Sequence, residues 1–381
     1  MNVLIYGSTE TSPSLRHEIP LAIIDPFLYL ETDGRRAVLT SSLEDARIAR
    51  AAAGVERLLD DALGLSELIA EGRSRAQVDQ ELCVRAVAAL GIHQASVPLD
   101  FPLALADRLR EAGITVTPDE ATFRERRREK TEQEMAGIRR SAAVACRAMA
   151  EAAGMLREST IDEDGLVLAG ELLSAERVRE RIREVCARGG APAPPDIMVI
   201  AAGPNAPIGH EPGSGPLPAH TPIEIDLWPR DEQSGCWADM TRTFVRGDIS
   251  DSIARLHALV LDAHERARNG VQPGVTGAEL HGLACEVIEA GGHRTQRTRA
   301  PGETLREGFY FGLGHGVGLE VHEPPDLGLG DANPLIAGDV IAVEPGIVIP
   351  AVGGTRVEDL LLVTPEGSEC LTGSSPYALT P

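Results

Sequence analysis

The chain has 381 residues, which is long for one hydrophobic core and comfortable for two domains, and 43% of the residues are hydrophobic. The formal net charge of −22 at pH 7 argues against nucleic acid or an anionic lipid surface as a partner. No apolar run is long enough to span a membrane, so we expect no membrane contact, and the first residues lack the basic and apolar regions of a signal peptide.

The cysteines are scattered along the chain and include no C-x-x-C pair. They lie at positions 83, 146, 186, 236, 285 and 370. This usage predicts reduced thiols in a cytoplasmic protein, and it argues against a disulfide framework or a zinc knuckle.

The first 120 residues alternate apolar runs with charged segments, which predicts a small α/β domain. Strands are expected at Pro20–Ile24 and Ala37–Thr40, with an Asp33–Gly34 hairpin turn before the second strand. Helices are expected at 42–59, 74–90 and 103–112. The second of these helices has Ser74 as its N-terminal cap and stops at Gly91.

A highly charged segment at 123–130 is the expected domain boundary, which divides the chain into domains 1–123 and 124–381. The acidic chain favours a charged helix entry here over a patch for nucleic acid. Beyond it, apolar residues at 135, 138, 142, 145, 149, 152 and 156 predict one buried face of a long helix. A second helix is expected at 162–188.

The pattern then changes to strands. A strand is expected at 197–202, followed by a loop at 203–220 that is rich in glycine and proline. Ile223–Trp228 alternates apolar and polar residues, and Trp237–Val245 returns as the second strand of a hairpin. Cross-strand pairing can therefore place Asp226 and Asp239 on one face.

Two helices and a β-rich segment complete the chain. The helices are expected at 251–269 and 276–290, and the second opens with Thr276 and Glu279 at the spacing of a capping box. Further strands are expected at 340–344, 347–349 and 354–364. Before them, four glycines lie in the seven residues 312–318, and this excludes an ordinary helix around His315.

Five residues at strand positions or turns are candidate metal ligands: Asp226, Asp239, His315, Glu344 and Glu358. Taken alone, each is better explained as a paired structural charge or a buried histidine than as a ligand. Two carboxylates at about 4 Å repel by roughly 4 kcal/mol at an effective dielectric near 20, so four in one pocket need protons or cations. Two divalent cations cancel the four charges, and carboxylates with one imidazole suit manganese, cobalt, iron or zinc.

The motifs that carry these residues resemble those of the M24 metallopeptidase family, which includes aminopeptidase P, prolidase and methionine aminopeptidase. The similar segments are Ile225–Leu227 with Asp239–Thr243, Gly312–Gly318, Val343–Gly346 and Arg356–Asp359. The resemblance implies an α+β chain, with a small N-terminal creatinase-like α/β domain. The C-terminal domain would have the pita-bread fold of antiparallel sheets flanked by helices.

The resemblance also implies roles for individual residues. Asp226 would bind one metal, His315 and Glu344 the other, and Asp239 and Glu358 would bridge both. A bridging hydroxide would attack the scissile carbonyl of a short peptide, at an N-terminal Xaa-Pro bond or a similar one. Glu344 would shuttle the proton, Arg356 would orient carboxylates, and His210 and His322 would contact substrate. A homodimer is expected from the same resemblance.

This sequence departs from the family pattern at three points. Trp228 stands where the family has glycine, and the hairpin between Asp226 and Asp239 is about two residues longer. Phe311 stands where many prolyl members carry another histidine. We expect Trp228 and Phe311 to shape the substrate site. The alternative hypothesis is a non-hydrolytic or altered-specificity protein of the same fold that binds peptides or small molecules.

Overall fold

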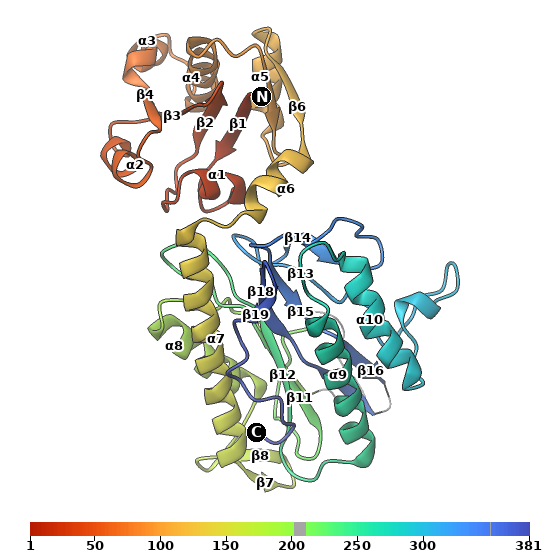
Figure 1. The fold of residues 1–381 in the computed structure, drawn as a ribbon. Helices are drawn as coiled ribbons and strands as arrows, with labels where there is room; N and C mark the ends of the chain where they lie inside the picture. Colours follow the sequence, from red (N-terminus) through yellow and green to blue (C-terminus); the bar gives the residue numbers. More distant parts are fainter. Residues whose placement is uncertain (202–210, 351) are drawn as a thin grey trace. The chain divides into compact units, whose positions relative to one another are not determined.

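The computed structural model describes residues 1–201, 211–350 and 352–381. The chain forms two compact units (Figure 1): an N-terminal unit of Met1–Thr131 with Gln233–Gly235, and a C-terminal unit of Glu132–Glu232 with Cys236–Pro381. The predicted division between residues 123 and 124 falls inside helix α6 (Glu120–Arg128). Among the described residues, no helix is long and apolar enough to cross a membrane.

The N-terminal unit is a six-stranded mixed sheet with the strand order β4-β3-β2-β1-β5-β6. Its strands are β1 (Val3–Gly7), β2 (Phe27–Thr32), β3 (Arg35–Thr40), β4 (Glu56–Leu59), β5 (Gln94–Val97) and β6 (Thr115–Pro118). Its helices are α1 (Pro13–Glu18), α2 (Asp45–Ala51), the 3₁₀ turn η1 (Asp61–Leu63), α3 (Leu65–Ala70), α4 (Arg75–Ala89), α5 (Leu103–Glu111) and α6.

Local sequence signals account for several of these elements. Asp33 and Gly34 have φ of 47° and 77°, so they form the predicted two-residue turn that pairs Thr32 with Arg35. Ser74 and Gln77 form a capping box at the start of α4, which confirms the predicted helix start.

Two predicted elements of this unit are wrong. Residues 20–24 form no strand, because the backbone groups of Ile23 bond to Thr9 and not to a neighbouring strand. The helix predicted over 42–59 ends at Ala51. Beyond Gly54, which has a φ of +89°, the chain continues as β4, which pairs in parallel with β3.

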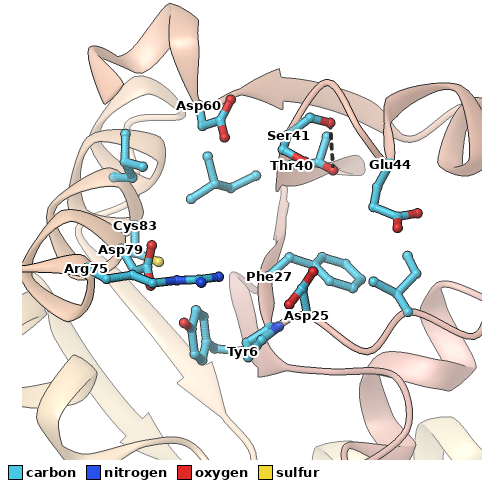
Figure 2. Close-up of a pocket in the computed structure, with 14 residues that line it drawn as sticks. Tyr6, Asp25, Phe27, Thr40, Ser41, Glu44, Asp60, Arg75, Asp79 and Cys83 are labelled. Carbon is cyan, nitrogen blue, oxygen red and sulfur yellow. Dashed lines mark hydrogen bonds and ion pairs between the residues drawn. The ribbon is translucent and has the colours of Figure 1, made fainter. Parts of the chain in front are cut away.

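A cavity of about 170 Å³ lies within the N-terminal unit. Figure 2 shows Arg75 and Asp79 of α4 on one side, Thr40 and Ser41 on another, and Tyr6 below them. None of the predicted site residues that the structure describes lines this cavity.

The C-terminal unit contains the remaining elements. Its helices are α7 (Glu132–Glu158), α8 (Ala175–Arg188), α9 (Asp251–Asn269), α10 (Gly277–Ala290) and the 3₁₀ turn η2 (Gln296–Thr298). Its strands are β7 (Thr160–Asp162), β8 (Gly165–Leu168), β9 (Glu171–Leu172), β10 (Met198–Ala201), β11 (Pro222–Leu227), β12 (Met240–Val245), β13 (Gly314–Gly316), β14 (Glu323–Leu327), β15 (Val340–Val343), β16 (Gly346–Ile349), β17 (Gly353–Arg356), β18 (Asp359–Thr364) and β19 (Gly367–Cys370).

Helices cover the strands of this unit on two sides (Figure 1). On one side α7 and α8 pack on the sheet β10-β11-β12, and on the other α9 and α10 pack on the sheet β14-β13-β15-β18-β19 and on β16. The apolar period predicted for α7 is confirmed by its buried residues, which include 138, 142, 145, 149, 152 and 156. The strands are therefore held between two hydrophobic clusters.

Two predictions in this unit need correction. The helix expected over 162–188 begins only at Ala175, after the cap Ser174, because β7, β8 and β9 form a small antiparallel sheet before it. The strand expected over 354–364 is broken at Val357–Glu358, and its halves, β17 and β18, belong to different sheets. Glu358 therefore lies at the point where the chain passes from one sheet to the other.

Candidate metal centre

The hairpin of β11 and β12 supplies the first two candidate ligands. Ile223, Ile225 and Leu227 enter the hydrophobic cluster under α7 and α8. The alternate residues Glu224 and Asp226 lie on the opposite face, as the period of two predicts. Asp239 precedes β12, whose first residue pairs with Leu227. Asp226 and Asp239 line one cavity.

Strand β13 brings His315 to the same cavity, and its glycines make the approach possible. Gly314 has a φ of +155°, and a Cβ built on it would meet the carbonyl oxygen of Ala342 at 1.9 Å. A Cβ on Gly316 would meet the carbonyl oxygen of Pro324 at 2.4 Å. The narrow fit of β13 between β14 and β15 thus requires glycine on both sides of His315.

Glu344 and Glu358 follow strand ends. Glu344 comes directly after β15, and its backbone N–H donates to the carbonyl of Leu313 at 2.8 Å. The backbone N–H of Glu358 donates to the carbonyl of Thr241 at 3.1 Å, and the Thr241 hydroxyl donates to Glu358 Oε2 at 2.8 Å. The backbone of Glu344, and both the backbone and the carboxylate of Glu358, are thereby held by neighbouring segments of the chain.

The structure brings all five candidate ligands to one cavity of about 360 Å³. Possible ligand atoms lie within 4.8 Å of one another in three groups: Asp226, Asp239 and Glu358; His315, Glu344 and Glu358; and Asp239, His315 and His322. Asp239, His315 and Glu358 each occur in two of these groups. The third group adds His322, which the sequence hypothesis had assigned to substrate.

Burial and mutual repulsion shift the titration of these groups. Burial, together with the charges of neighbouring carboxylates, raises the pKa of Asp239 and of Glu358 well above their ordinary values. Burial raises the pKa of Glu344 to about 7, although Arg356 opposes this shift. Burial and then His322 lower the pKa of His315 to about 4, so the imidazole is neutral at pH 7 and able to ligate a cation.

Arg356 is the basic partner of this acidic cluster. Its Nη2 donates to Asp226 Oδ2 at 2.5 Å, and its Nη1 donates to Glu344 Oε2 at 3.1 Å. Burial alone would lower its pKa, but Asp226, Glu224 and Glu344 hold the pKa well above the ordinary value. Among the described residues that line the two cavities, this single guanidinium faces a larger number of carboxyl groups.

The donor set fits divalent cations. Asp226 Oδ1 and Asp239 Oδ1 are buried, and neither accepts a hydrogen bond from any residue that the structure describes. A buried carboxylate oxygen without a partner is costly, and a cation supplies the missing interaction. Oxygen donors with one imidazole match the ligand preferences of manganese, cobalt, iron or zinc.

The remaining predicted residues lie in different places. His322 and Trp228 line the cavity of the candidate ligands. The ring centroids of His322 and His315 are 4.2 Å apart. Phe311 lines a neighbouring cavity of about 300 Å³, which we call the annex. Glu344 and Arg356 line both cavities. His210 lies outside the described residues.

Three titratable residues that line these cavities have no role in the sequence hypothesis. Asp196 lines the cavity of the candidate ligands, and Glu224 and Tyr310 line the annex. Glu224 carried a usable signal, because it stands two residues before Asp226 on a strand and therefore on the same face. Asp196 and Tyr310 lie outside the strands and had no such signal.

The model of metallopeptidase family M24 matches residues 136–365. A curated relative, the Xaa-Pro dipeptidase of Pyrococcus furiosus, is 34% identical over 208 residues, which are 53% of this chain and 55% of the relative. The chain thus spans about half the length of that relative.

Two solved structures share the fold over nearly the whole chain. The Xaa-Pro dipeptidase from Bacillus anthracis has a TM-score of 0.80 and 24% identity, covering 99% of this chain and 94% of that one. The X-Pro aminopeptidase from Thermotoga maritima has a TM-score of 0.77 and 22% identity, covering 99% and 96%. The expected α+β fold with a pita-bread domain is confirmed by these likenesses.

Proposed function

Because the chain belongs to metallopeptidase family M24, we propose that it is a dinuclear, metal-dependent peptidase that hydrolyses N-terminal Xaa-Pro or similar bonds of short peptides. The observation that carries the proposal is the convergence of Asp226, Asp239, His315, Glu344 and Glu358 on one cavity, with two buried carboxylate oxygens lacking partners among the described residues. A cluster of this charge is stable only with protons or cations.

In this proposal the cations are held by the chain's own carboxylates and one imidazole. Asp226 would hold one cation, His315 and Glu344 would hold the other, and Asp239 and Glu358 would contribute to both. When bound, two divalent cations, with manganese, cobalt, zinc or iron as candidates, supply Lewis acidity and lower the pKa of a water molecule. The raised pKa values of Asp239 and Glu358 show that ionised carboxylates without a cation are unfavourable here, and this supports a site that binds cations.

The protein groups around the cations position the substrate and move the proton. Glu344 is assigned the transfer of the proton. Without a cation, burial raises the pKa of its carboxyl to about 7. Arg356 fixes the orientation of Asp226 and Glu344 through its two hydrogen bonds. His322 and Trp228 line the cavity. From the family resemblance, His322 is assigned to contact the reacting carbonyl and His210 to contact substrate.

The proposal includes a cytoplasmic location and a homodimer. The scattered spacing of the six cysteines, without a C-x-x-C pair, supports a reducing compartment, and the family resemblance supports the pairing of two chains.

Metal content and activity test the proposed function together. The purified protein should contain divalent metal by elemental analysis. It should lose hydrolysis of Xaa-Pro peptides on chelation and regain it with Mn²⁺ or Co²⁺. The variant Asp239→Ala should abolish hydrolysis while keeping the circular dichroism spectrum of the folded chain. The exposed Asp248→Ala is the matched control and should keep full activity.

Two results would contradict the proposal. Protein without bound divalent metal, and without activity after Mn²⁺ or Co²⁺ is added, would point to the non-hydrolytic alternative. Activity that persists in Asp239→Ala would contradict the role of Asp239 between the two cations. A panel of Xaa-Pro and Xaa-Ala dipeptides and tripeptides would then define the requirement for proline.

A further inference from the structure

The annex is a cavity of about 300 Å³ that adjoins the candidate metal centre through Glu344 and Arg356. Its other walls are mostly apolar and aromatic and include Met198, Val348, Tyr310 and Phe311. The rings of Phe309 and Tyr310 pack edge-on against Phe311, with centroid distances of 5.1 and 5.5 Å. A peptide that reacts at the metal centre therefore has a preformed, largely apolar space for the group on one side of its scissile bond.

Glu224 is the unexpected member of this wall. Its residue is 3% exposed, and its Oε1 lies 3.3 Å from Arg356 Nη2. Arg356 is the only basic side chain among the described residues that line the annex. A buried carboxylate is poorly screened by water. Glu224 therefore strongly disfavours the binding of a second negative charge in this pocket.

Among the described residues that line the annex, the charge balance leaves no positive charge for a substrate carboxylate. Asp226, Glu344 and Glu224 all lie within 3.3 Å of the Arg356 guanidinium. If cations neutralise Asp226 and Glu344, Glu224 still balances Arg356 one to one. A substrate carboxylate that enters the annex would lose its water next to Glu224. Whether or not metal ions are bound, no unbalanced positive group among the described residues would then pair with it.

We propose that Glu224 makes the annex a selector against free carboxylates, so that the enzyme prefers peptides that continue beyond the residue after the scissile bond, or end there in an amide, over free dipeptides. This inference rests on the proposed peptidase function and specifies its substrate class. A neutral peptide carbonyl can enter the annex without adding charge, whereas the α-carboxylate of a dipeptide adds one beside Glu224.

The part of the candidate metal centre that lies away from the annex indicates the orientation of the substrate. Asp196 is exposed and lines the cavity of the candidate ligands but not the annex, so it offers a carboxylate to the substrate's ammonium group. The residue that follows the scissile bond then extends toward the annex. The apolar side chains Met198, Val348 and Phe311 suit an apolar ring or alkyl group there.

The test compares three matched substrates of the metal-loaded wild-type protein: an Xaa-Pro dipeptide with a free carboxylate, the same dipeptide as its C-terminal amide, and a tripeptide that begins with it. The amide and the tripeptide should exceed the free acid in kcat/KM by about tenfold or more. In Glu224→Gln the ratio of amide to free acid should fall by about tenfold, mainly through a lower KM for the free acid.

A matched control and a second variant separate charge selection from general damage. Glu171→Gln removes an exposed carboxylate of the same unit that lines neither cavity, and it should leave the ratio unchanged. Phe311→His adds a hydrogen-bond donor to the annex and should also raise the relative kcat/KM of the free acid. The wild-type comparison requires no variant, so it decides the proposal even if Glu224→Gln does not fold.

Each outcome points to one conclusion. A wild-type protein that hydrolyses the free dipeptide as well as the amide overturns the inference but leaves the peptidase function intact. A folded Glu224→Gln protein with an unchanged ratio also overturns it. If the metal-loaded protein hydrolyses none of the three substrates, the proposed function itself is overturned, and the inference falls with it.

Discussion

His281 on α10 shows what burial does to a single titratable residue away from the candidate metal centre. The side chain is fully buried, and its ring lies 5.1 Å from that of Phe309. Neither ring nitrogen has a hydrogen-bond partner among the described residues. Burial, and then the charge of Arg297, lower the pKa of His281 to about 4. The folded chain therefore holds His281 in its neutral form down to well below neutral pH.

His281 should make the protein sensitive to acid. Its folded pKa lies below the unfolded value near 6.5, so its contribution to stability is complete above pH 6.5 and is lost as the pH falls toward 4. The free energy of unfolding should fall between pH 7 and 4.5 in both proteins. The fall should be about 2 kcal/mol smaller in His281→Leu than in wild type. Urea unfolding at each pH measures this difference.

The exposed His93→Leu serves as the control and should follow the wild-type pH profile. A profile of His281→Leu that runs parallel to wild type would show that the buried imidazole does not cause the acid sensitivity.

At the scale of elements, strand β13 decides where His315 lies. It runs antiparallel to both β14 and β15, with Gly314 opposite Leu327 on one side and Val343 on the other. The register between β13 and β14 shifts at His315–Gly316, so the ladder is irregular at the candidate ligand. The position of the imidazole therefore depends on close backbone packing rather than on the side chain alone.

The variant Gly314→Ala should displace β13. An added Cβ would lie 1.9 Å from the carbonyl oxygen of Ala342, in a backbone conformation that side chains rarely adopt. We expect a loss of about 1 to 3 kcal/mol in the free energy of unfolding. Metal affinity, measured by calorimetric titration with Mn²⁺, should weaken because His315 moves with the strand.

Gly330→Ala is the matched control, since a Cβ there meets no atom within 4 Å. It should retain wild-type stability and metal affinity. Equal behaviour of the two variants would mean that the glycine at 314 is not what positions His315.

For the whole molecule, the division into two units separates two sets of hydrophobic clusters. Residues of the N-terminal unit form two clusters of their own, and those of the C-terminal unit form three. All five candidate ligands belong to the C-terminal unit. A cation that binds them stabilises the unit that holds them, because it binds the folded state and not the unfolded one.

Removing metal should therefore lower the stability of the C-terminal unit and leave that of the N-terminal unit unchanged. Hydrogen exchange of chelated protein should be faster than that of Mn²⁺-loaded protein in strands β11, β12, β15 and β18. Exchange in the six-stranded sheet of the N-terminal unit should not change. A change of similar size in both units would show that metal binding and N-terminal folding are coupled.

Local patterns in the sequence determined much of this protein. The α7 period, the capping boxes at Ser74 and Thr276, and the Asp33–Gly34 turn depend on residues a few positions apart, and the structure contains them all. The alternation in β11 likewise determined the faces of Glu224 and Asp226. The family motifs identified the set of candidate ligands. None of these sequence signals specifies how far apart the ligand atoms lie.

Only the tertiary structure decided the rest. Residues 162–172 carry a helix-compatible pattern, yet β8 pairs with β7 and β9, and Leu166 is buried in the cluster under α7 and α8. The break between β17 and β18, the ion pair of Glu224 with Arg356, and the position of Phe311 in the annex have the same origin. Each depends on contacts between residues far apart in the chain, and such contacts override local preference.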